Sequence, residues 1–521
     1  MITAYREPDR AKGRQLMDKL IRWVSAGVPS ALTELITLGR TLKKRAAEVL
    51  AYFDRPGTSN GPTEAINGRR EHLRGSALGF RTSPTTLPDR SSKPAASGHD
   101  YTLDCEEPFR SRPARSYVSR NSRALTYDVC SFEHINVDMR GQMKITGYTS
   151  LTTVHDWGRP IGDINGFVAA GKTEVPILLV HADGGLVGVG LGAHTDIERV
   201  FPAVEGEDPR SVTALYDRML AYVFKTGHAG ATFGTIGAVD MALWDLKAKM
   251  ADEPLWRTLG GRDRFVPAYA SGLDIALTDG ELVALHERFA DRGFASGKVK
   301  GGKDPLTDIA RLKAVGDVLR RNSPRPALML DANEAWNRKQ AVRFVSEVEQ
   351  QVELTWIEEP VRRWDAQGNA AVSRAVKAGV ATGENLVGLE QYRPLLDANA
   401  VDIVQAGMVW GITHFLRVSA LAHAFDLPVS LVGYNCNPVA HAATAVPNHL
   451  TTEVQDLDYP IGLTVDQEIA DGGIVLGDAP GLGITVDEEL IASIPTTDGW
   501  RITAGPHVRP ERAGLRLVPE Q

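Results

Sequence analysis

The sequence has few cysteines and no long apolar run, and each absence excludes a class of protein. Its 521 residues include three widely separated cysteines, Cys105, Cys130 and Cys436, and no Cys-x-x-Cys pair. Such spacing favours neither a disulfide framework nor a structural zinc site. No apolar run approaches the roughly 18 residues of a membrane span, and the charged N-terminus lacks the apolar stretch of a signal peptide. We therefore expect no membrane span and a reducing, cytoplasmic location.

Charge is unevenly distributed along the chain. Residues 1–140 hold 23 Lys and Arg against 16 Asp and Glu, a balance of +7, which leaves 58 − 23 = 35 against 65 − 16 = 49, or −14, for the rest. A basic N-terminal part joined to an acidic body indicates two pieces of different origin. The overall length is consistent with two or three domains.

Three carboxylates follow short apolar runs at nearly equal spacing. Asp331 follows Ala-Leu-Met-Leu, Glu358 follows Leu-Thr-Trp-Ile, and Glu384 follows Val-Ala-Thr-Gly, at intervals of 27 and 26 residues. Each interval accommodates one strand, one helix and two loops, and the C-terminal ends of barrel strands converge on one face. A single acid in such a place often caps the next helix. Three in register favour a site for Mg²⁺, which prefers hard oxygen ligands.

Two lysines precede the first of these carboxylates by one strand–helix unit. Lys298 and Lys300 are two residues apart, so on a strand both side chains leave on the same face. Lysines are usually solvated, but a strand interior holds two cations poorly unless carboxylates lie nearby. The pair therefore predicts a base beside the metal.

The N-terminal piece shows helical periodicity from about residue 10 to residue 52. Residues 60–67 then read Asn-Gly-Pro-Thr-Glu-Ala-Ile-Asn, a block that resembles the C-terminal end of insertion-sequence transposases of the Asp-Asp-Glu type over residues 1–81. The resemblance places the last catalytic carboxylate on Glu64. Two-metal phosphoryl transfer needs several carboxylates held together, and the two preceding acids are missing. We expect an inactive remnant, with no nucleic-acid binding of consequence.

The remaining chain divides into a linker and two folded parts. Residues 82–142 are rich in Ser, Pro and Arg and predict a disordered linker. Residues 143–262 show strand and hairpin patterns followed by a long helical pattern, which predicts an α+β domain. Alternating strand and helix patterns over 263–474 predict a barrel, after which 475–505 is expected to return to the first domain.

Several motifs in this region resemble one family in order and in spacing. They are Ala-Leu-Trp-Asp-Leu-Lys-Ala-Lys at 242–249, Lys-x-Lys at 298–300, Leu-Asp-Ala-Asn-Glu-Ala-Trp at 330–336, Trp-Ile-Glu-Glu-Pro at 356–360 and Gly-Glu-Asn at 383–385. The chain over residues 143–495 resembles the mandelate racemase/muconate-lactonizing branch of the enolase superfamily. The resemblance implies an α/β fold, a modified (β/α)7β TIM barrel with an α+β capping domain, which usually assembles as a homo-oligomer.

The resemblance also assigns roles to the residues above. Asp331, Glu358 and Glu384 would bind Mg²⁺, and Lys300 would remove the α-proton of a carboxylate substrate. Lys298 would lower the pKa of Lys300 by like-charge proximity and contact the substrate carboxylate. Glu453, at the end of the predicted eighth strand, would be protonated and donate a hydrogen bond to the same carboxylate.

The second face of the site is less complete. The racemase-type pattern pairs an Asp on strand six with a His on strand seven; we assign the Asp to Asp402, but the His position falls near Val432. His441, at helix spacing beyond it, is a weaker candidate for a displaced acid. Substrate-binding candidates complete the set: Asn333, Tyr434, Asn435, and His155 and Trp157 in the capping-domain loop.

A missing second base disfavours two-base racemisation. The leading hypothesis is a Mg²⁺-dependent lyase that dehydrates a sugar acid or related 2-hydroxy acid, with a small-molecule carboxylate as its partner. The alternative is an isomerase (a racemase, epimerase or cycloisomerase) that acts through the same abstraction of the α-proton. A remote alternative is a DNA-associated fusion protein that uses the basic N-terminal part.

Overall fold

The computed structural model describes residues 9–26, 42–54, 143–433, 436–494 and 509. By its internal contacts the chain divides into two compact units, residues 1–128 and 129–521, and each is described by itself. Glu64, the predicted linker 82–142, and the loop residues Tyr434 and Asn435 lie outside the described residues.

The N-terminal unit contains helices α2 (Arg10–Ala26) and α4 (Ala46–Asp54). An apolar cluster joins them, made of Met17, Ile21, Leu42, Leu50 and Phe53. These helices fall within the region whose periodicity predicts helix.

The second unit begins with a three-stranded antiparallel sheet in the order β1–β4–β5, covered by helices. Its elements are β1 (Ile145–Asp156), β4 (Lys172–Ala182), η1 (Asp183–Gly185), β5 (Val187–Leu191), α6 (Ile197–Val200), η2 (Phe201–Ala203), α7 (Val212–Tyr222), α8 (Gly230–Met250) and α9 (Leu255–Thr258). In the part of the chain that the structure describes, no helix is long and apolar enough to cross a membrane.

Strand β5 lies directly on helix α8, and small residues make this possible. A Cβ on Gly188 would stand 2.1 Å from the carbonyl oxygen of Ala242, and one on Gly190 would stand 2.0 Å from that of Ala238. Asp245 of α8 fixes the arrangement, because its carboxylate accepts from the backbone of Val189 at 2.8 Å and from Leu482 at 2.7 Å. The Trp-Asp-Leu-Lys motif thus joins the sheet, the helix and a late turn.

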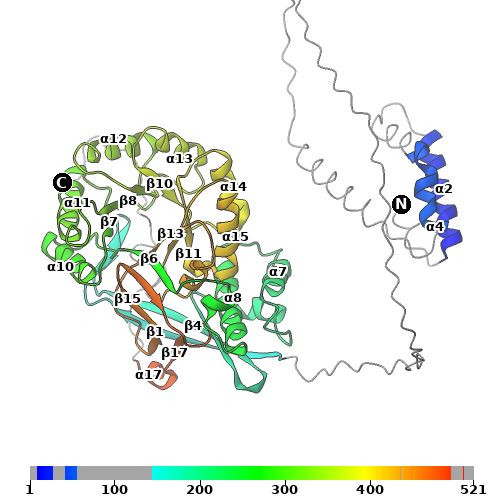
Figure 1. Cartoon of the computed structure of the whole chain (residues 1–521), viewed down its shortest axis with the longest axis horizontal. Helices are drawn as coiled ribbons and strands as arrows, with labels where there is room; N and C mark the ends of the chain where they lie inside the picture. Colours follow the sequence, from blue (N-terminus) through cyan, green and yellow to red (C-terminus); the bar gives the residue numbers. More distant parts are fainter. Residues whose placement is uncertain (1–8, 27–41, 55–142, 434–435, 495–508, 510–521) are drawn as a thin grey trace, which may run out of the picture. The chain divides into compact units, whose positions relative to one another are not determined.

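Eight parallel strands form the barrel, and pairing of the last strand with the first closes it. The strands are β6 (Phe265–Ala270), β7 (Ser296–Lys300), β8 (Ala327–Asp331), β9 (Trp356–Glu358), β10 (Gly379–Thr382), β11 (Ile403–Gly407), β12 (Val429–Val432) and β13 (His449–Val454). The connecting helices surround them (Figure 1): α10 (Asp279–Ala290), α11 (Pro305–Leu319), α12 (Arg338–Val348), α13 (Ala366–Ser373), α14 (Leu389–Asp397), α15 (Ile412–His423) and α16 (Ala440–Ala443), with η3 (Met408–Trp410) after β11. The predicted barrel with an α+β cap is confirmed.

Strand alternation sets what faces the barrel interior. In register, Lys300 pairs with Asp331 and Asp331 with Glu358, so these side chains point inward from consecutive strands. The intervening Val299 and Leu330 belong to the apolar core on the helix side. The sequence therefore directs charge inward and apolar bulk outward at one end of the barrel.

The cap is tied to the barrel mouth by a short hairpin, β2 (Ile161–Asp163) and β3 (Gly166–Val168). The backbone of Gly162 donates to the carbonyl of Leu273 at 2.8 Å, and the Asn165 amide donates to the carbonyl of Asn333 at 3.4 Å. These two contacts lie in the loops after β6 and β8, so the hairpin spans the end of β7 between them.

Short elements after the barrel extend its sheet and return to the cap. They are β14 (Leu463–Val465), β15 (Gln467–Ala470), β16 (Gly473–Leu476), β17 (Ile484–Val486) and α17 (Glu488–Ser493). Strand β16 pairs antiparallel with β6. The chain reaches β1 already at Ile461, whose backbone donates to the carbonyl of Val154 at 3.0 Å.

Candidate active site

Five charged side chains meet inside the C-terminal end of the barrel. Lys298 Nζ lies 2.6 Å from Glu358 Oε1 and 2.8 Å from Glu453 Oε1, and Lys300 Nζ lies 2.5 Å from Asp331 Oδ2. None of the five residues is more than 4% exposed. Buried charges are stable only when they are paired, so the two ammonium groups and three carboxylates depend on one another.

The three predicted metal ligands come from adjacent strand ends. Burial raises the pKa of Glu358 to about 8, with the charge of Asp331 adding to the effect, and burial raises the pKa of Glu384 to about 6. For Asp331, Lys300 and Lys298 outweigh burial and hold the pKa below its usual value. Four acidic side chains (Asp331, Glu358, Glu384 and Glu453) thus face only two ammonium groups, and this excess of hard oxygen donors fits a divalent cation such as Mg²⁺.

The ligands do not already converge. Among the described residues, no three Asp, Glu, His or Cys side chains are arranged to share a metal ion. Instead, the lysine ammonium groups pair with Asp331 and Glu358, and the Asn385 amide donates to Glu384 Oε1 at 3.0 Å. Asp331, Glu358 and Glu384 thus fit Mg²⁺ in chemistry and strand order, with the two ammonium groups now beside the oxygens that would hold it.

Carboxylates dominate the electrostatics of the lysine pair. Burial lowers the pKa of Lys300, but Asp331 reverses the shift and the pKa lies above its ordinary value. Burial also lowers the pKa of Lys298, but the charges of Glu358 and Glu453 outweigh burial, so the pKa lies well above the ordinary value. The predicted like-charge effect of Lys298 on Lys300 has the expected sign but is outweighed.

Glu453 at the end of β13 is paired with Lys298 rather than poised as a neutral donor. Burial would raise the pKa of this carboxyl, but Lys298 and Lys300 outweigh burial and lower it. The Gln455 amide also donates to Glu453 Oε2 at 2.9 Å. In this arrangement Glu453 is therefore a carboxylate, which differs from the protonated form expected from the resemblance.

The loops after β8 and β9 turn sharply, and polar residues other than glycine occupy the turns. Asn333, Glu334 and Glu359 all have positive φ angles of 41°, 59° and 42°, a conformation that costs non-glycine residues energy. The backbone N–H of Asn333 donates to Asp331 Oδ1 at 2.9 Å, and Asn385 donates to Glu359 Oε1 at 3.1 Å. Asn333 therefore holds Asp331 through its backbone, beneath the cap hairpin.

Asp402 does not lie in the site, and its assignment to the strand-six position is wrong. It precedes β11 at the opposite end of the barrel, where it is exposed and accepts from Ser373 Oγ at 3.0 Å and from the backbone of Val380 at 2.8 Å. The strand ends instead at Gly407. The carboxylate stands at the start of the strand, whereas a residue of the site must stand at its end.

The end of strand seven carries no acid or base among the described residues. Val432 ends β12 and pairs with Gly407 in register. His441 is buried in α16, and its Nδ1 accepts from the backbone of Trp256 at 3.2 Å, so it holds the cap rather than the site. Tyr434 and Asn435 lie outside the described residues.

His155 and Trp157 lie together in the cap at the end of β1. Their rings make an edge contact with centroids 4.7 Å apart, and His155 Nε2 lies 3.0 Å from Asp456 Oδ2 in the loop after β13. Trp157 donates to Thr173 Oγ1 at 3.0 Å. Both rings are thus held by the cap and by the loop after β13, and their contact with substrate remains a prediction.

The sequence reasoning missed three polar side chains near the cluster. Tyr269 accepts from Lys298 Nζ at 3.3 Å, Asp163 is buried in the cap hairpin, and Gln405 faces the barrel interior from β11. Gln405 could have been found by counting two residues back from Gly407, because alternate residues of a strand share one face. Tyr269 and Asp163 stand in no motif that identifies them.

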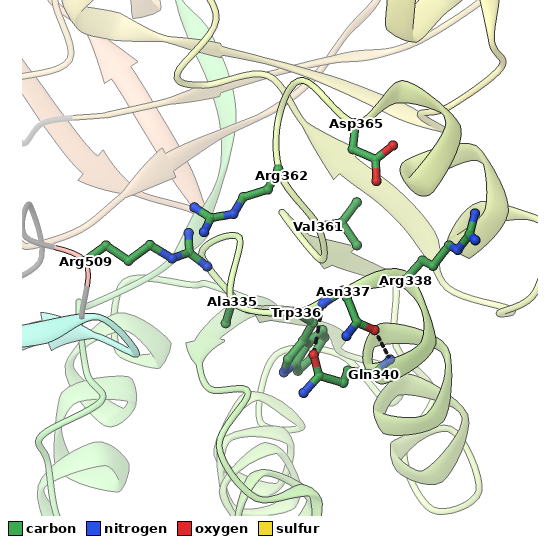
Figure 2. Close-up of a pocket in the computed structure, with 9 residues that line it drawn as sticks. All are labelled: Ala335, Trp336, Asn337, Arg338, Gln340, Val361, Arg362, Asp365 and Arg509. Atoms are coloured by element: carbon green, nitrogen blue, oxygen red, sulfur yellow. Dashed lines mark hydrogen bonds between the residues drawn. The ribbon is translucent and has the colours of Figure 1, made fainter. Parts of the chain in front are cut away.

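A cavity of about 370 Å³ opens beside the loops after β8 and β9 (Figure 2). It is lined by Ala335, Trp336, Asn337, Arg338, Gln340, Val361, Arg362, Asp365 and Arg509. None of the five charged cluster residues lines it. The site is therefore defined by its buried charges and not by this cavity.

A capped barrel with inward lysines facing three carboxylates defines a barrel enzyme of the enolase superfamily, and comparisons with known proteins agree. Residues 281–490 match the enolase C-terminal domain-like family, and residues 166–260 match the N-terminal domain of mandelate racemase/muconate lactonizing enzyme. The chain belongs to this mandelate racemase/muconate lactonizing enzyme family. Residues 1–85 match a transposase family, as the sequence predicts.

Curated relatives and solved structures include both lyases and isomerases. A 3,6-anhydro-alpha-L-galactonate cycloisomerase of Streptomyces coelicolor is 31% identical over 56% of this chain and 80% of its own length. An L-talarate/galactarate dehydratase of Salmonella typhimurium is 31% identical over 61% of this chain and 82% of its own length. A Polaromonas L-talarate dehydratase complexed with Mg and L-glucarate covers 67% of this chain and 97% of its own, at 29% identity and a TM-score of 0.60.

Proposed function

We propose that this chain is a Mg²⁺-dependent dehydratase of a sugar acid or related 2-hydroxy acid. The observation that carries the proposal is the asymmetry of the site. Lys298, Lys300 and the three carboxylates occupy one wall, whereas the strand-six and strand-seven ends opposite are Gly407 and Val432. The lysine wall can exchange a proton with a substrate. At the strand ends opposite, Gly407 and Val432 have no side chain that can accept or donate a proton.

Each residue of the lysine wall has its own task in this reaction. Lys300 removes the α-proton as the neutral amine, because binding of Asp331 to Mg²⁺ would weaken the ion pair that raises the pKa of Lys300. Lys298 holds the substrate carboxylate beside Glu453. Asp331, Glu358 and Glu384 would hold Mg²⁺, which would neutralise the negative charge that builds on the substrate carboxylate as the proton leaves. Return of a proton from Lys300 to the departing β-hydroxyl, on the same face, completes a syn elimination. The resulting enol tautomerises to a 2-keto acid.

An isomerase is the second candidate, because the cycloisomerase among the relatives could share this first step. The test is incubation of the purified full chain with a library of sugar acids and Mg²⁺ in D₂O. Dehydration predicts 2-keto acid formation. Exchange with inversion, or ring closure without keto acid, would favour the isomerase. Absence of exchange from every acid would overturn both.

The N-terminal unit is proposed to be a transposase remnant without a catalytic role. Removing residues 1–140 should leave turnover unchanged. Tight, salt-sensitive DNA binding by the full chain, lost on this truncation, would instead support a DNA-associated function. Homo-oligomerisation also remains a prediction, and sedimentation of the full chain tests it.

A further inference from the structure

Gln405 is a buried side chain whose polar groups have no partner in the part of the chain that the structure describes. It is 0% exposed, and neither its Oε1 nor its Nε2 forms a hydrogen bond with any of the described residues. An unpaired buried amide is costly, because it gives up water without replacement. Native structures keep such groups where a ligand or an ordered water completes them.

The barrel register places this amide in the active-site layer. Inward side chains from alternate strands of a closed barrel share a layer, because the strands tilt. Lys298 is in register with Trp356, yet it contacts Glu358, two residues further on. Alternate strands are therefore offset by two residues within one layer.

The same offset identifies the other members of this layer. Glu358 is in register, through Ala381, with Ile403, and two residues on is Gln405. Gln405 is in register, through Ser430, with Thr451, and two residues on is Glu453. Since Glu453 contacts Lys298 at 2.8 Å, the circle closes. The layer is Lys298, Glu358, Gln405 and Glu453.

Glycines stand between this amide and the barrel mouth. Gly407 lies two residues further on in β11, and Gly383 follows β10, the neighbouring strand. Neither position places a side chain over Gln405. A Cβ at Gly407 would stand 2.3 Å from the carbonyl oxygen of Glu384, so that position is held to glycine by the backbone of a predicted metal ligand.

The chemistry of the amide identifies its ligand. Nε2 must donate and Oε1 must accept, so a carboxylate, which only accepts, can satisfy one atom alone. A hydroxyl both donates and accepts. We propose that Gln405 is a specificity-determining residue that binds a hydroxyl group of the substrate on the wall opposite the lysines. This inference rests on the proposed function, because it takes the carboxylate substrate of that reaction and adds that the substrate carries several hydroxyl groups.

Equilibrium binding tests the subsite without requiring turnover. Calorimetry with Mg²⁺ would compare D-gluconate and galactarate with their monodeoxy analogues, for wild type and for Gln405→Leu. Wild type should bind the parent acid about tenfold or more tightly than one particular analogue, and Gln405→Leu should remove that preference while the other ratios stay unchanged. Failure of α-proton exchange in D₂O would count against the proposed function only.

A matched control separates this role from a structural one. Thr382 is also fully buried with no partner for Oγ1 among the described residues, but it is in register with the outward-facing Val404. Thr382→Val should leave all binding ratios unchanged. Because Leu relieves two unpaired polar atoms, Gln405→Leu should melt no lower than wild type, whereas a structural glutamine would lose thermal stability.

Three results would overturn the subsite. They are no binding of any acid to wild type, equal weakening of parent and deoxy acids by Gln405→Leu, and unchanged ratios in that variant. Equal weakening would assign the amide to an ordered water instead of a substrate hydroxyl.

Discussion

The two walls of the barrel mouth differ sharply in chemistry although they share one backbone design. Strands β7 to β9 end in Lys300, Asp331 and Glu358, which are buried and form ion pairs. Strands β11 and β12 end in Gly407 and Val432. In the proposed reaction, the residues that take the proton and the positions that select the substrate are therefore carried on separate strands of the fold. The first wall carries buried charge, and the second carries no charged side chain at its strand ends.

Removing the proposed base should have the largest effect on this comparison. Lys300→Ala should lower the rate of α-proton exchange by about 10³-fold or more, because a positioned base contributes about that much. NMR in D₂O measures the exchange. Lys303→Ala, at an exposed position three residues further along, should retain the wild-type rate. Full exchange by Lys300→Ala would remove the distinction between the walls.

The free energy of unfolding should depend on pH through His414, which lies in α15 on the helix side of the second wall. Burial lowers the pKa of His414 to about 3, and its neutral Nε2 accepts from the backbone of Gly388 at 3.2 Å. The folded pKa lies below the unfolded one, so its contribution to stability is present above about pH 6.5 and is lost as the pH falls toward 3. Between pH 6.5 and 4.5 the loss should be roughly 2 kcal/mol.

Urea unfolding at the two pH values measures this loss. His414→Gln should flatten the pH dependence, whereas His423→Gln, at the exposed end of the same helix, should keep it. A pH dependence identical in all three proteins would contradict the assignment. His441 and His449, whose pKa values burial lowers to about 4, add to the slope in all three proteins.

The glycine that ends strand six should not tolerate a side chain. A Cβ at Gly407 would lie 2.3 Å from the carbonyl oxygen of Glu384 and 2.8 Å from Trp410 Nε1. Gly407→Ala should therefore lower the free energy of unfolding by about 1–3 kcal/mol and weaken Mg²⁺ binding, as measured by urea unfolding and calorimetry. At Gly280, where nothing lies within 4 Å, the same substitution should be neutral or stabilising. Unchanged Mg²⁺ affinity in Gly407→Ala would show that the end of strand six has no influence on the predicted metal site.

The smallest effect is expected at Asp402. Asp402→Asn weakens two hydrogen bonds at the far end of β11, so the free energy of unfolding should fall by no more than about 1 kcal/mol. Turnover and exchange should equal those of the wild type. A large loss of exchange would return Asp402 to the catalytic residues despite its place at the far end of the strand.

Much of the lysine wall could be predicted from the sequence because its signals are local. An apolar run that ends in an acid gives the end of a strand, and a two-residue spacing gives a common face, so Lys298, Lys300, Asp331 and Glu358 needed no distant partner to be placed. The second wall lacked such a signal. Its only acid, Asp402, stands at the start of the strand, and Gly407 and Val432 carry no chemistry that a motif could mark.

The sequence by itself determined the order of strands and helices, the inward direction of the charged residues and the family to which they belong, since periodicity and spacing are properties of neighbouring residues. Only the tertiary structure decided which charges pair, that Glu453 is ionised beside Lys298, that Asp402 lies outside the site and that Gln405 shares a layer with Glu358. Those facts depend on strand tilt and barrel closure, which bring together residues far apart in the chain.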